Sequence, residues 1–237
     1  MNGSPHEAVD PPTGGVGEAG HLEAKATIDF RHELVRKSIH VTSLSIPIIY
    51  WFITWKLALM ILVPLALAFL ATDLARYYHP GVGDRFYRWF GWLLRKHESD
   101  HTRKRLNGAT NILLSAVLCV LIFPKLITIT AFSILIISDT SSALIGRRFG
   151  RRRFFHKSVE GALAFFLTAV LVVFVTPKIA GLPLEYVIGI SAAAVGAITE
   201  SLSSTIDDNI AVPLSIGCVM WGLYSLLLPG LDLYKVL

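Results

Sequence analysis

The stretch SDTSSALIGRRFGRRRFFHKSVEG, residues 138–161, places one aspartate, five arginines, a histidine, a lysine and a glutamate between two apolar segments. Residues 126–137 before it and residues 162–175 after it are almost entirely apolar. Apolar runs that approach about 20 residues are typical of helices that cross a bilayer. We therefore expect two membrane-spanning helices joined by a basic loop at one face of the membrane.

The whole chain has the composition of a membrane protein. Of its 237 residues, 53% are hydrophobic and 16% are charged, whereas about a quarter are charged in an ordinary soluble domain. Residues 1–27 are rich in Gly and Pro and predict a disordered tail, and residues 28–237 predict one integral membrane domain. The pattern indicates an all-α polytopic bundle of about seven transmembrane helices, at residues 39–54, 57–75, 109–123, 126–146, 160–176, 184–204 and 209–228.

Basic residues are shared very unequally between the two faces of such a bundle. With seven spans, 18 of the 22 Lys and Arg residues fall on the side of the N-terminus and of the loops at 76–108 and 147–159. The other four are Lys56, Lys125, Lys178 and Lys235. Because cytoplasmic loops carry the excess of Lys and Arg, we expect the N-terminus and the basic loop to face the cytoplasm.

Residues 84–97 are too charged to cross a membrane. Their large apolar residues recur at helical spacing and are Phe86, Trp89, Phe90, Leu93 and Leu94. Their basic residues take another face and are Arg85, Arg88, Arg95 and Lys96. This pattern predicts an amphipathic helix that lies in the cytoplasmic interface of the membrane.

Two short patterns that can indicate metal or redox chemistry are not favoured here. Cys119 and Cys218 lie inside apolar runs without metal-ligand spacing, which predicts buried free cysteines. The segment HESDH, His97 to His101, matches the H-E-x-x-H zinc pattern. It lies in a charged loop with no apolar helix face and no evident third ligand, so we expect no zinc site.

Six carboxylates at membrane depth lie near the cytoplasmic ends of the expected spans. They are Asp73, Asp139, Glu160, Glu200, Asp207 and Asp208. Intramembrane carboxylates are costly and mark functional sites, and oxygen ligands of this kind suit Mg²⁺ bound together with substrate phosphates. The neighbouring arginines suit the phosphates themselves. A cytoplasmic polyphosphate site is therefore predicted, and a basic cluster that serves membrane topology alone is the alternative.

Four segments carry a family resemblance. They are RHELVRKSIHV at 31–41, SDTSSALIGRRFG at 138–150, KSVEG at 157–161 and ESLSSTIDDNIAVPL at 200–214. In this order and spacing, over about residues 31–228, the chain resembles the CTP-dependent lipid kinase family. That family includes dolichol kinase, phytol kinase and CTP-dependent diacylglycerol kinase, and it is related to phosphatidate cytidylyltransferase. The chain departs from the family pattern at His156, often glycine, and at Ala162, often serine.

The resemblance implies a reaction and its participants. It implies transfer of the γ-phosphoryl group of CTP to the hydroxyl of a membrane lipid alcohol, which is a polyprenol such as dolichol, a phytol-like isoprenoid or diacylglycerol. Mg²⁺ or another divalent cation is the implied cofactor. Arg36 and Lys37 match the family's basic pair, and Asp139 and Gly146 match its aspartate and its loop glycine. Residues 28–237 are then the catalytic domain.

The predicted site residues fall into three groups. The catalytic residues are Asp139, Glu160, Lys157, Arg36, Lys37, His40 and Glu200. The nucleotide-binding residues are Gly146, Arg147, Arg148, Gly150, Arg151, Lys157 and Ser158. The metal ligands are Asp139, Asp207 and Asp208. Within these groups, the basic side chains neutralise the phosphates, and Glu160 or Glu200 orients the lipid hydroxyl.

Two other functions remain open at this point. A cytidylyltransferase would join CTP to a lipid phosphate and release pyrophosphate. A transporter without enzymatic activity would use the same carboxylates as an ion relay, although transporter sites lie near the midplane of the membrane and these residues lie at one face. The expected partners are the lipid alcohol, CTP and the bilayer, with no nucleic acid, and a homodimer is left open.

Overall fold

The structure is a computed structural model that describes residues 37–38, 40–90, 106–203 and 206–234. About 80% of it is helical, so the predicted helical architecture is confirmed in its main lines. The helices are α2 (Ser45–Phe52), α3 (Trp55–Tyr78), α4 (Pro80–Phe90), α5 (Gly108–Ile122), α6 (Lys125–Phe149), α7 (Val159–Val175), α8 (Pro183–Leu202) and α9 (Asp208–Leu227). The predicted tail at 1–27, Arg36 and the segment HESDH lie outside the described residues.

Three of the described helices, α3, α6 and α9, are long and apolar enough to cross a membrane. Two more, α5 and α7, are apolar but shorter. These helices are compatible with an integral membrane protein. In the described part of the first expected span, residues 40–42 are helical, a turn follows at residues 43–44, and the eight-residue α2 comes after it. The count of seven spans therefore stays a prediction.

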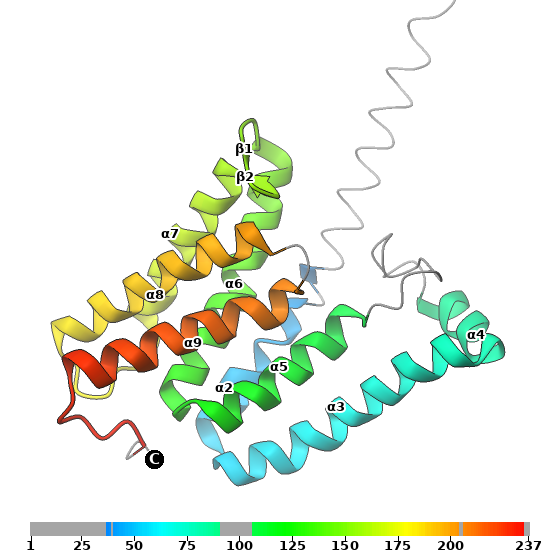
Figure 1. The fold of residues 1–237 in the computed structure, drawn as a ribbon, viewed down its shortest axis with the longest axis horizontal. Helices are drawn as coiled ribbons and strands as arrows, with labels where there is room; N and C mark the ends of the chain where they lie inside the picture. The colour runs from blue at the N-terminus through cyan, green and yellow to red at the C-terminus, as the bar shows by residue number, and fades with distance from the viewer. Residues whose placement is uncertain (1–36, 39, 91–105, 204–205, 235–237) are drawn as a thin grey trace, which may run out of the picture.

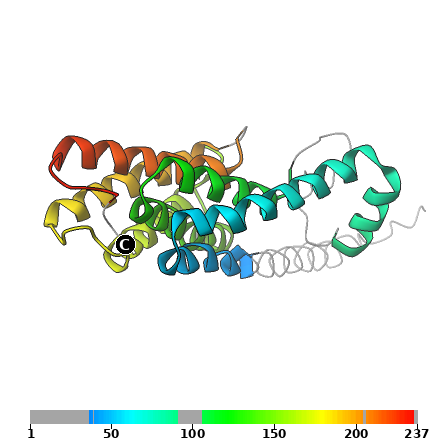
Figure 2. The same ribbon diagram turned by 90° about the horizontal axis from the view of Figure 1, so that it is seen from below.

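Helix α6 is the centre of the bundle. All residues from 126 to 136 are buried, which explains why this helix is apolar all round. It contacts α7, α9, α2 and α5, and Figure 1 shows it between the α7–α8 side and the α5–α3 side of the molecule. Helices α8 and α9 run antiparallel next to each other, while α3 carries α4 away from the bundle, as Figure 2 shows from below.

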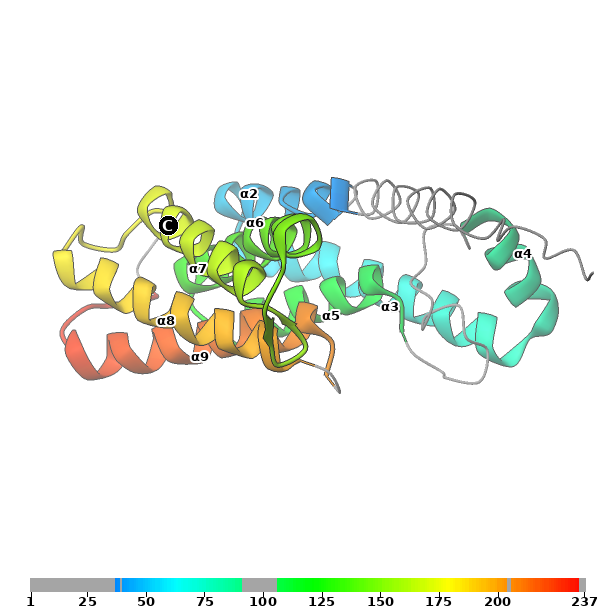
Figure 3. The ribbon, with the colours of Figure 1, turned by 90° about the horizontal axis from the view of Figure 1, so that it is seen from above.

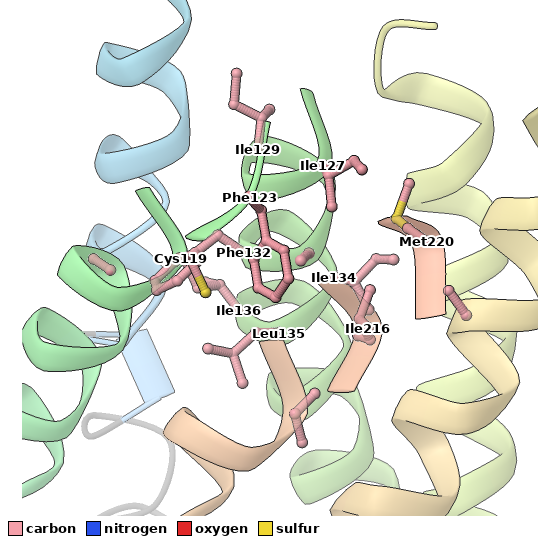
Figure 4. Close-up of a cluster of buried hydrophobic side chains, with 14 of the residues drawn as sticks. Cys119, Phe123, Ile127, Ile129, Phe132, Ile134, Leu135, Ile136, Ile216 and Met220 are labelled. Atoms are coloured by element: carbon pink, nitrogen blue, oxygen red, sulfur yellow. The ribbon is translucent and has the colours of Figure 1, made fainter. Parts of the chain in front are cut away.

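The core is built from the side chains that α6 shares with its neighbours. Phe132 and Ile134 of α6 are almost completely buried and lie close to Phe123 and Ile216 (Figure 4). Cys119 belongs to the same cluster, so its predicted burial is confirmed. Cys218 is exposed on α9, and the prediction that it is buried is wrong. An apolar run buries only the helix face that meets a neighbour, and Cys218 lies outside that face.

Helix α4 covers part of the segment expected to lie in the membrane interface. It begins at Pro80, a residue that favours the first turn of a helix. Arg85, Arg88 and Trp89 are exposed. Residues 91–97, the second half of the predicted amphipathic helix, lie outside the described residues, so the interfacial location stays a prediction.

A fully buried glutamate at the opposite end of the bundle from the basic loop was not singled out from the sequence. Glu185, in the first turn of α8, accepts hydrogen bonds from the backbone N–H groups of Ile179, Ala180 and Leu182 at 2.7, 3.0 and 2.9 Å. The Tyr224 hydroxyl of α9 donates to the same carboxylate at 3.0 Å. Glu185 therefore ties the α7–α8 turn to α9.

Replacing Glu185 with alanine is expected to destabilise the protein by about 3 kcal/mol or more, because several buried donors lose their acceptor at once. Unfolding in detergent micelles would measure the change. Tyr224→Phe removes one donor and is expected to cost about 1 kcal/mol. Glu185 is in the first turn of α8, whereas the basic loop contacts Ser201 at the other end of this helix, so the folded fraction should keep the structure of that loop. An alanine variant as stable as the unmodified protein would contradict this role.

Candidate functional site

One large pocket opens where five helices begin or end. The C-terminal ends of α6 and α8 and the N-terminal ends of α5, α7 and α9 lie at the same end of the bundle (Figures 1 and 3). The pocket has a volume of about 1040 Å³, which is large enough for a nucleotide-sized ligand. Its wall is formed by Lys37, Leu106, Asn111, Asp139, Ser142, Ala143, Gly146, Arg147, Gly150, Arg151, Arg152, Arg153, Phe155, His156, Lys157, Ser158, Gly161, Ser203, Ile206, Asp207, Asp208 and Ile210.

The first feature of the pocket is a buried ion pair between the N-terminal segment and α6. Lys37 Nζ donates to Asp139 Oδ2, and both residues are 3% exposed. His40 Nε2 lies 3.4 Å from the same oxygen. Two opposite charges this deeply buried stabilise the fold only when they are paired. The sequence placed Lys37 and His40 among the catalytic residues, and in the structure both lie beside Asp139.

The second feature is a lysine surrounded by carboxylates. Lys157 Nζ lies 2.6 Å from Glu200 Oε1 and 3.5 Å from Asp208 Oδ2. Ser142 Oγ of α6 donates to Glu200 Oε1 at 3.1 Å. Burial alone would lower the pKa of Lys157, but the charges of Asp139, Asp208 and Glu200 outweigh it and hold the pKa above its usual value. Lys157 is therefore a permanent cation that joins the loop after α6 to α8 and α9.

The basic segment between α6 and α7 is a short hairpin, where the sequence predicted only a loop. Helix α6 continues past Gly146 through Arg147 and Arg148, whose charges are favourable in a last helical turn. Strands β1 (Arg153–Phe154) and β2 (Lys157–Ser158) then pair in antiparallel fashion. The backbone N–H of His156 donates to the carbonyl of Ser201 at 3.2 Å, which attaches the hairpin to the end of α8.

Glycines allow the hairpin and the two helices to approach closely. A β-carbon at Gly150 would lie 2.2 Å from the carbonyl oxygen of Gly146 and 2.8 Å from Ser158 Oγ. A β-carbon at Gly161 would lie 3.1 Å from Ser158 Oγ and 3.1 Å from the carbonyl oxygen of Ser142. Ser158 also caps α7, since its Oγ accepts the Gly161 N–H at 3.1 Å. The predicted residues Gly146, Gly150 and Ser158 therefore form the junction that positions the basic segment.

Oxygen atoms with no hydrogen-bond partner lie buried at the junction of α8 and α9. Within the described residues they are Glu200 Oε2, Asp208 Oδ1 and Asn209 Oδ1. Asp207 caps α9 and accepts hydrogen bonds from Asn209 N at 3.0 Å and Asn209 Nδ2 at 2.6 Å. Carboxylate and amide oxygens are ligands that suit Mg²⁺. The donor set at this junction therefore fits a hard divalent cation.

No group of three or more His, Cys, Asp or Glu side chains in the described part of the chain is arranged to hold a metal by itself. Mg²⁺ commonly binds through one or two carboxylates and completes its shell with water and substrate phosphates. The predicted ligands Asp139, Asp207 and Asp208 all lie on the pocket wall. Their role as metal ligands stays a prediction.

Most of the predicted site residues meet in this pocket, and four lie apart from its wall. Glu200 is fully buried behind Lys157, and His40 reaches the site through Asp139. Glu160 is in the first turn of α7 and does not line the pocket. The Arg148 guanidinium lies 5.5 Å from the ring centre of Phe149 instead of on the wall.

Asp73, one of the six carboxylates, belongs to a separate cluster. It accepts hydrogen bonds from Asn107 N at 2.9 Å, Asn107 Nδ2 at 2.9 Å and Thr110 Oγ1 at 2.7 Å. Arg76 Nε lies 3.1 Å from Asp73 Oδ1. This cluster holds the start of α5 against α3, so the structure gives Asp73 a packing role.

Two residues of the pocket wall, Asn111 and Phe155, and Asn209, which follows Asp208 of that wall, were not singled out from the sequence. Asn111 is a buried amide on α5, Asn209 follows the two aspartates that begin α9, and Phe155 is at the hairpin turn. An asparagine inside the apolar run at 109–123 is a signal that could have found Asn111, because polar side chains at membrane depth are costly. Phe155 gives no comparable signal, since its exposure depends on the hairpin.

The fold and the pocket define a nearly all-α protein with apolar helices and a strongly charged site at one end. No family model matches the chain, and no solved structure matches it. The chain is similar to an uncharacterised protein of Rickettsia prowazekii (strain Madrid E), with 29% identity over 192 residues. The match covers 80% of this chain and 93% of that protein. The similarity thus extends over most of both chains.

Proposed function

We propose that this protein is an integral membrane kinase that transfers the γ-phosphoryl group of CTP to the hydroxyl of a lipid alcohol. The observation that carries the proposal is the composition of the pocket wall. Arginines from the 147–153 segment lie on it together with the carboxylates Asp139, Asp207 and Asp208. A site that binds a metal and a polyphosphate needs both kinds of group.

The position of the four family-like segments gives further support. Lys37 and Asp139 are 102 residues apart in sequence, and Lys157 and Glu200 are 43 apart. Both pairs are in contact at one end of the bundle. Segments that share a pocket despite such separations are expected of a single active site, whereas basic residues that served topology alone would need no buried carboxylate partners.

The residues divide the work as follows. Asp139, Asp208 and Asn209 would hold Mg²⁺, which neutralises charge on the triphosphate when bound. Arg147 and Arg151 bind the β- and γ-phosphates. Lys37 keeps Asp139 in place. These groups act through position and charge, as phosphoryl transfer requires.

The carboxylate that orients the lipid hydroxyl must reach the pocket. Glu160 does not line it, and Glu200 is covered by Lys157. We therefore assign Glu200 to holding Lys157 and place the orienting carboxylate among Asp139, Asp207 and Asp208. The lipid hydroxyl would enter at the cytoplasmic face, with its chain in the bilayer.

Labelled CTP tests the reaction class. The purified full-length chain in detergent would be incubated with Mg²⁺ and with dolichol-like, isoprenoid or diacylglycerol alcohols. With γ-labelled CTP, a kinase yields labelled lipid. A cytidylyltransferase acting on a lipid phosphate transfers label from α-labelled CTP and releases γ-label as pyrophosphate. If γ-labelled CTP labels none of these alcohols, or if only a lipid phosphate becomes labelled from α-labelled CTP, the kinase proposal is wrong.

The planar geometry of the arginine side chain allows a test at a residue of the pocket wall. Replacing Arg151 with lysine is expected to lower kcat/KM for CTP roughly 10- to 100-fold, because lysine cannot make the two-donor contact to a phosphate. Arg148→Lys is the matched control, since Arg148 lies over Phe149 and off the wall. It should change kcat/KM by less than about twofold, which is within the usual range for surface substitutions. Equal effects of the two substitutions would place the phosphates elsewhere.

A further inference from the structure

An exposed phenylalanine occupies an unfavourable backbone conformation at the tip of the hairpin. Phe155 has φ of 51°, in the left-handed region. Among the residues that the structure describes, it is the only one other than glycine with a positive φ. A bulky residue in this region costs about 1–3 kcal/mol. Phe155 is 61% exposed, so it does not recover this cost by burial in the core. Phe155 nevertheless lines the polar pocket.

The hairpin holds this conformation from both sides. Arg153 pairs with Ser158 and Phe154 with Lys157, which leaves Phe155 and His156 as the two turn residues. The His156 N–H is bonded to Ser201, and Lys157 is bonded to Glu200. The Phe154 ring packs edge-on against the Phe155 ring, with centroids 4.7 Å apart. These contacts therefore hold Phe155 in a fixed position at the pocket wall.

We propose that Phe155 forms the platform on which the base of the donor nucleotide stacks. The proposal rests on the proposed function, because it places the base of CTP in the same pocket as its phosphates. The wall next to Phe155 is cationic, with Arg151, Arg152 and Arg153 preceding it. A ligand that needs both a flat apolar contact and several cations has an aromatic base joined to phosphates. Stacking of a base on an aromatic side chain is tolerant of base identity and stabilises binding substantially.

A comparison with the nearby Phe149 distinguishes base stacking at Phe155 from contact of the ring with the bilayer. Phe149 is 59% exposed, almost as much as Phe155, but it does not line the pocket. If exposed rings near the basic segment served only to contact lipid, the two residues would be equivalent. The proposal makes them different, because Phe155 lines the pocket and Phe149 does not.

Binding of CTP and of inorganic tripolyphosphate to the full-length chain in detergent, with Mg²⁺ and measured by calorimetry, tests the proposal. Phe155→Ala is expected to weaken CTP binding roughly 5- to 100-fold, the effect of losing one base–aromatic stack. Its affinity for tripolyphosphate should be unchanged, since that ligand has no base. This unchanged affinity also shows that the variant is folded. Phe155→Trp should retain CTP affinity within a few-fold, and Phe149→Ala should retain it fully.

The outcomes distinguish failure of the Phe155 stacking role from failure of the kinase proposal. If Phe155→Ala binds CTP as tightly as the unmodified chain, or if Phe149→Ala weakens CTP equally, the stacking role is overturned while the kinase proposal stands. If Phe155→Ala loses tripolyphosphate to the same extent as CTP, the residue supports the hairpin and not the base, which also overturns it. If the unmodified chain binds neither ligand, the proposed function fails as well.

Discussion

Replacing Asp139 with asparagine is expected to lower kcat/KM for CTP roughly 100- to 1000-fold, the range for loss of one preorganised electrostatic group at a reacting centre. Asp139 lies on the pocket wall and is the acceptor for Lys37, with His40 3.4 Å from the same oxygen. Asparagine keeps the shape and removes the charge. The measurement is steady-state turnover of CTP with a lipid alcohol, at several Mg²⁺ concentrations.

The same substitution should also weaken the fold, because it leaves the ammonium of Lys37 buried without a carboxylate. Removing one partner of a buried pair costs about 3–5 kcal/mol. Combining Asp139→Asn with Lys37→Met removes both charges and is expected to recover most of the stability but none of the activity. This double variant therefore separates the chemical role of Asp139 from its structural role.

The matched control is Asp232→Asn, at an exposed position near the C-terminus. It should leave both turnover and stability unchanged. If the double variant regained the turnover of the unmodified chain, Asp139 would have no chemical role. If the single variant kept normal turnover and normal stability, neither the metal-binding role nor the buried pair would be tenable.

Replacing Gly150 with alanine is expected to lower kcat/KM for CTP about 100-fold, the cost of misplacing a reacting group by about 1 Å. The added β-carbon would lie 2.2 Å from the carbonyl oxygen of Gly146, and backbone cannot rotate away as a side chain can. The end of α6 and the hairpin must therefore move apart. Arg151 and Lys157, which follow on this hairpin, would leave their positions on the pocket wall.

The control for Gly150→Ala is the same change at Gly222 in α9, where a β-carbon would meet nothing within 4 Å. Alanine there should be neutral or slightly stabilising, because it favours the helix over glycine. Turnover and unfolding would be measured on both variants. The comparison shows what the same added methyl group does at Gly150, where space is lacking, and at Gly222, where it is not. If Gly150→Ala turned over CTP as fast as Gly222→Ala, the hairpin would not position the residues proposed to bind the phosphates.

The apolar runs of the sequence located the helices well, because the signal is local. Each expected span from residue 57 onward coincides with a helix of 15 residues or more. The end of α6 was placed at residue 146, whereas the helix continues to Phe149. Glycine within a helix costs only about 1 kcal/mol, so a hydropathy pattern that stops at Gly146 does not require the helix to stop there.

For the candidate site, the types of residue were predictable and their contacts were not. Carboxylates at membrane depth identified Asp139, Glu200 and Asp208, because burying a charge demands a partner or a function. Lys157 was identified from the basic loop. The sequence could not show that Lys157 contacts Glu200, since the two lie on different elements and 43 residues apart. Either Glu160 or Glu200 could equally be placed in the site by spacing alone.

By itself, the sequence determined a helical chain with apolar segments, a basic segment between two of them and a set of carboxylates near the ends of the helices. Those features depend on hydrophobic periodicity and on the cost of burying charge, which act along a few turns of chain. Only the tertiary structure decided that Phe155 lines the pocket, that Arg148 does not, and that Glu185 closes the opposite end. Those outcomes depend on how the helices pack against one another and on the direction of a two-residue turn, which no local pattern in the sequence contains.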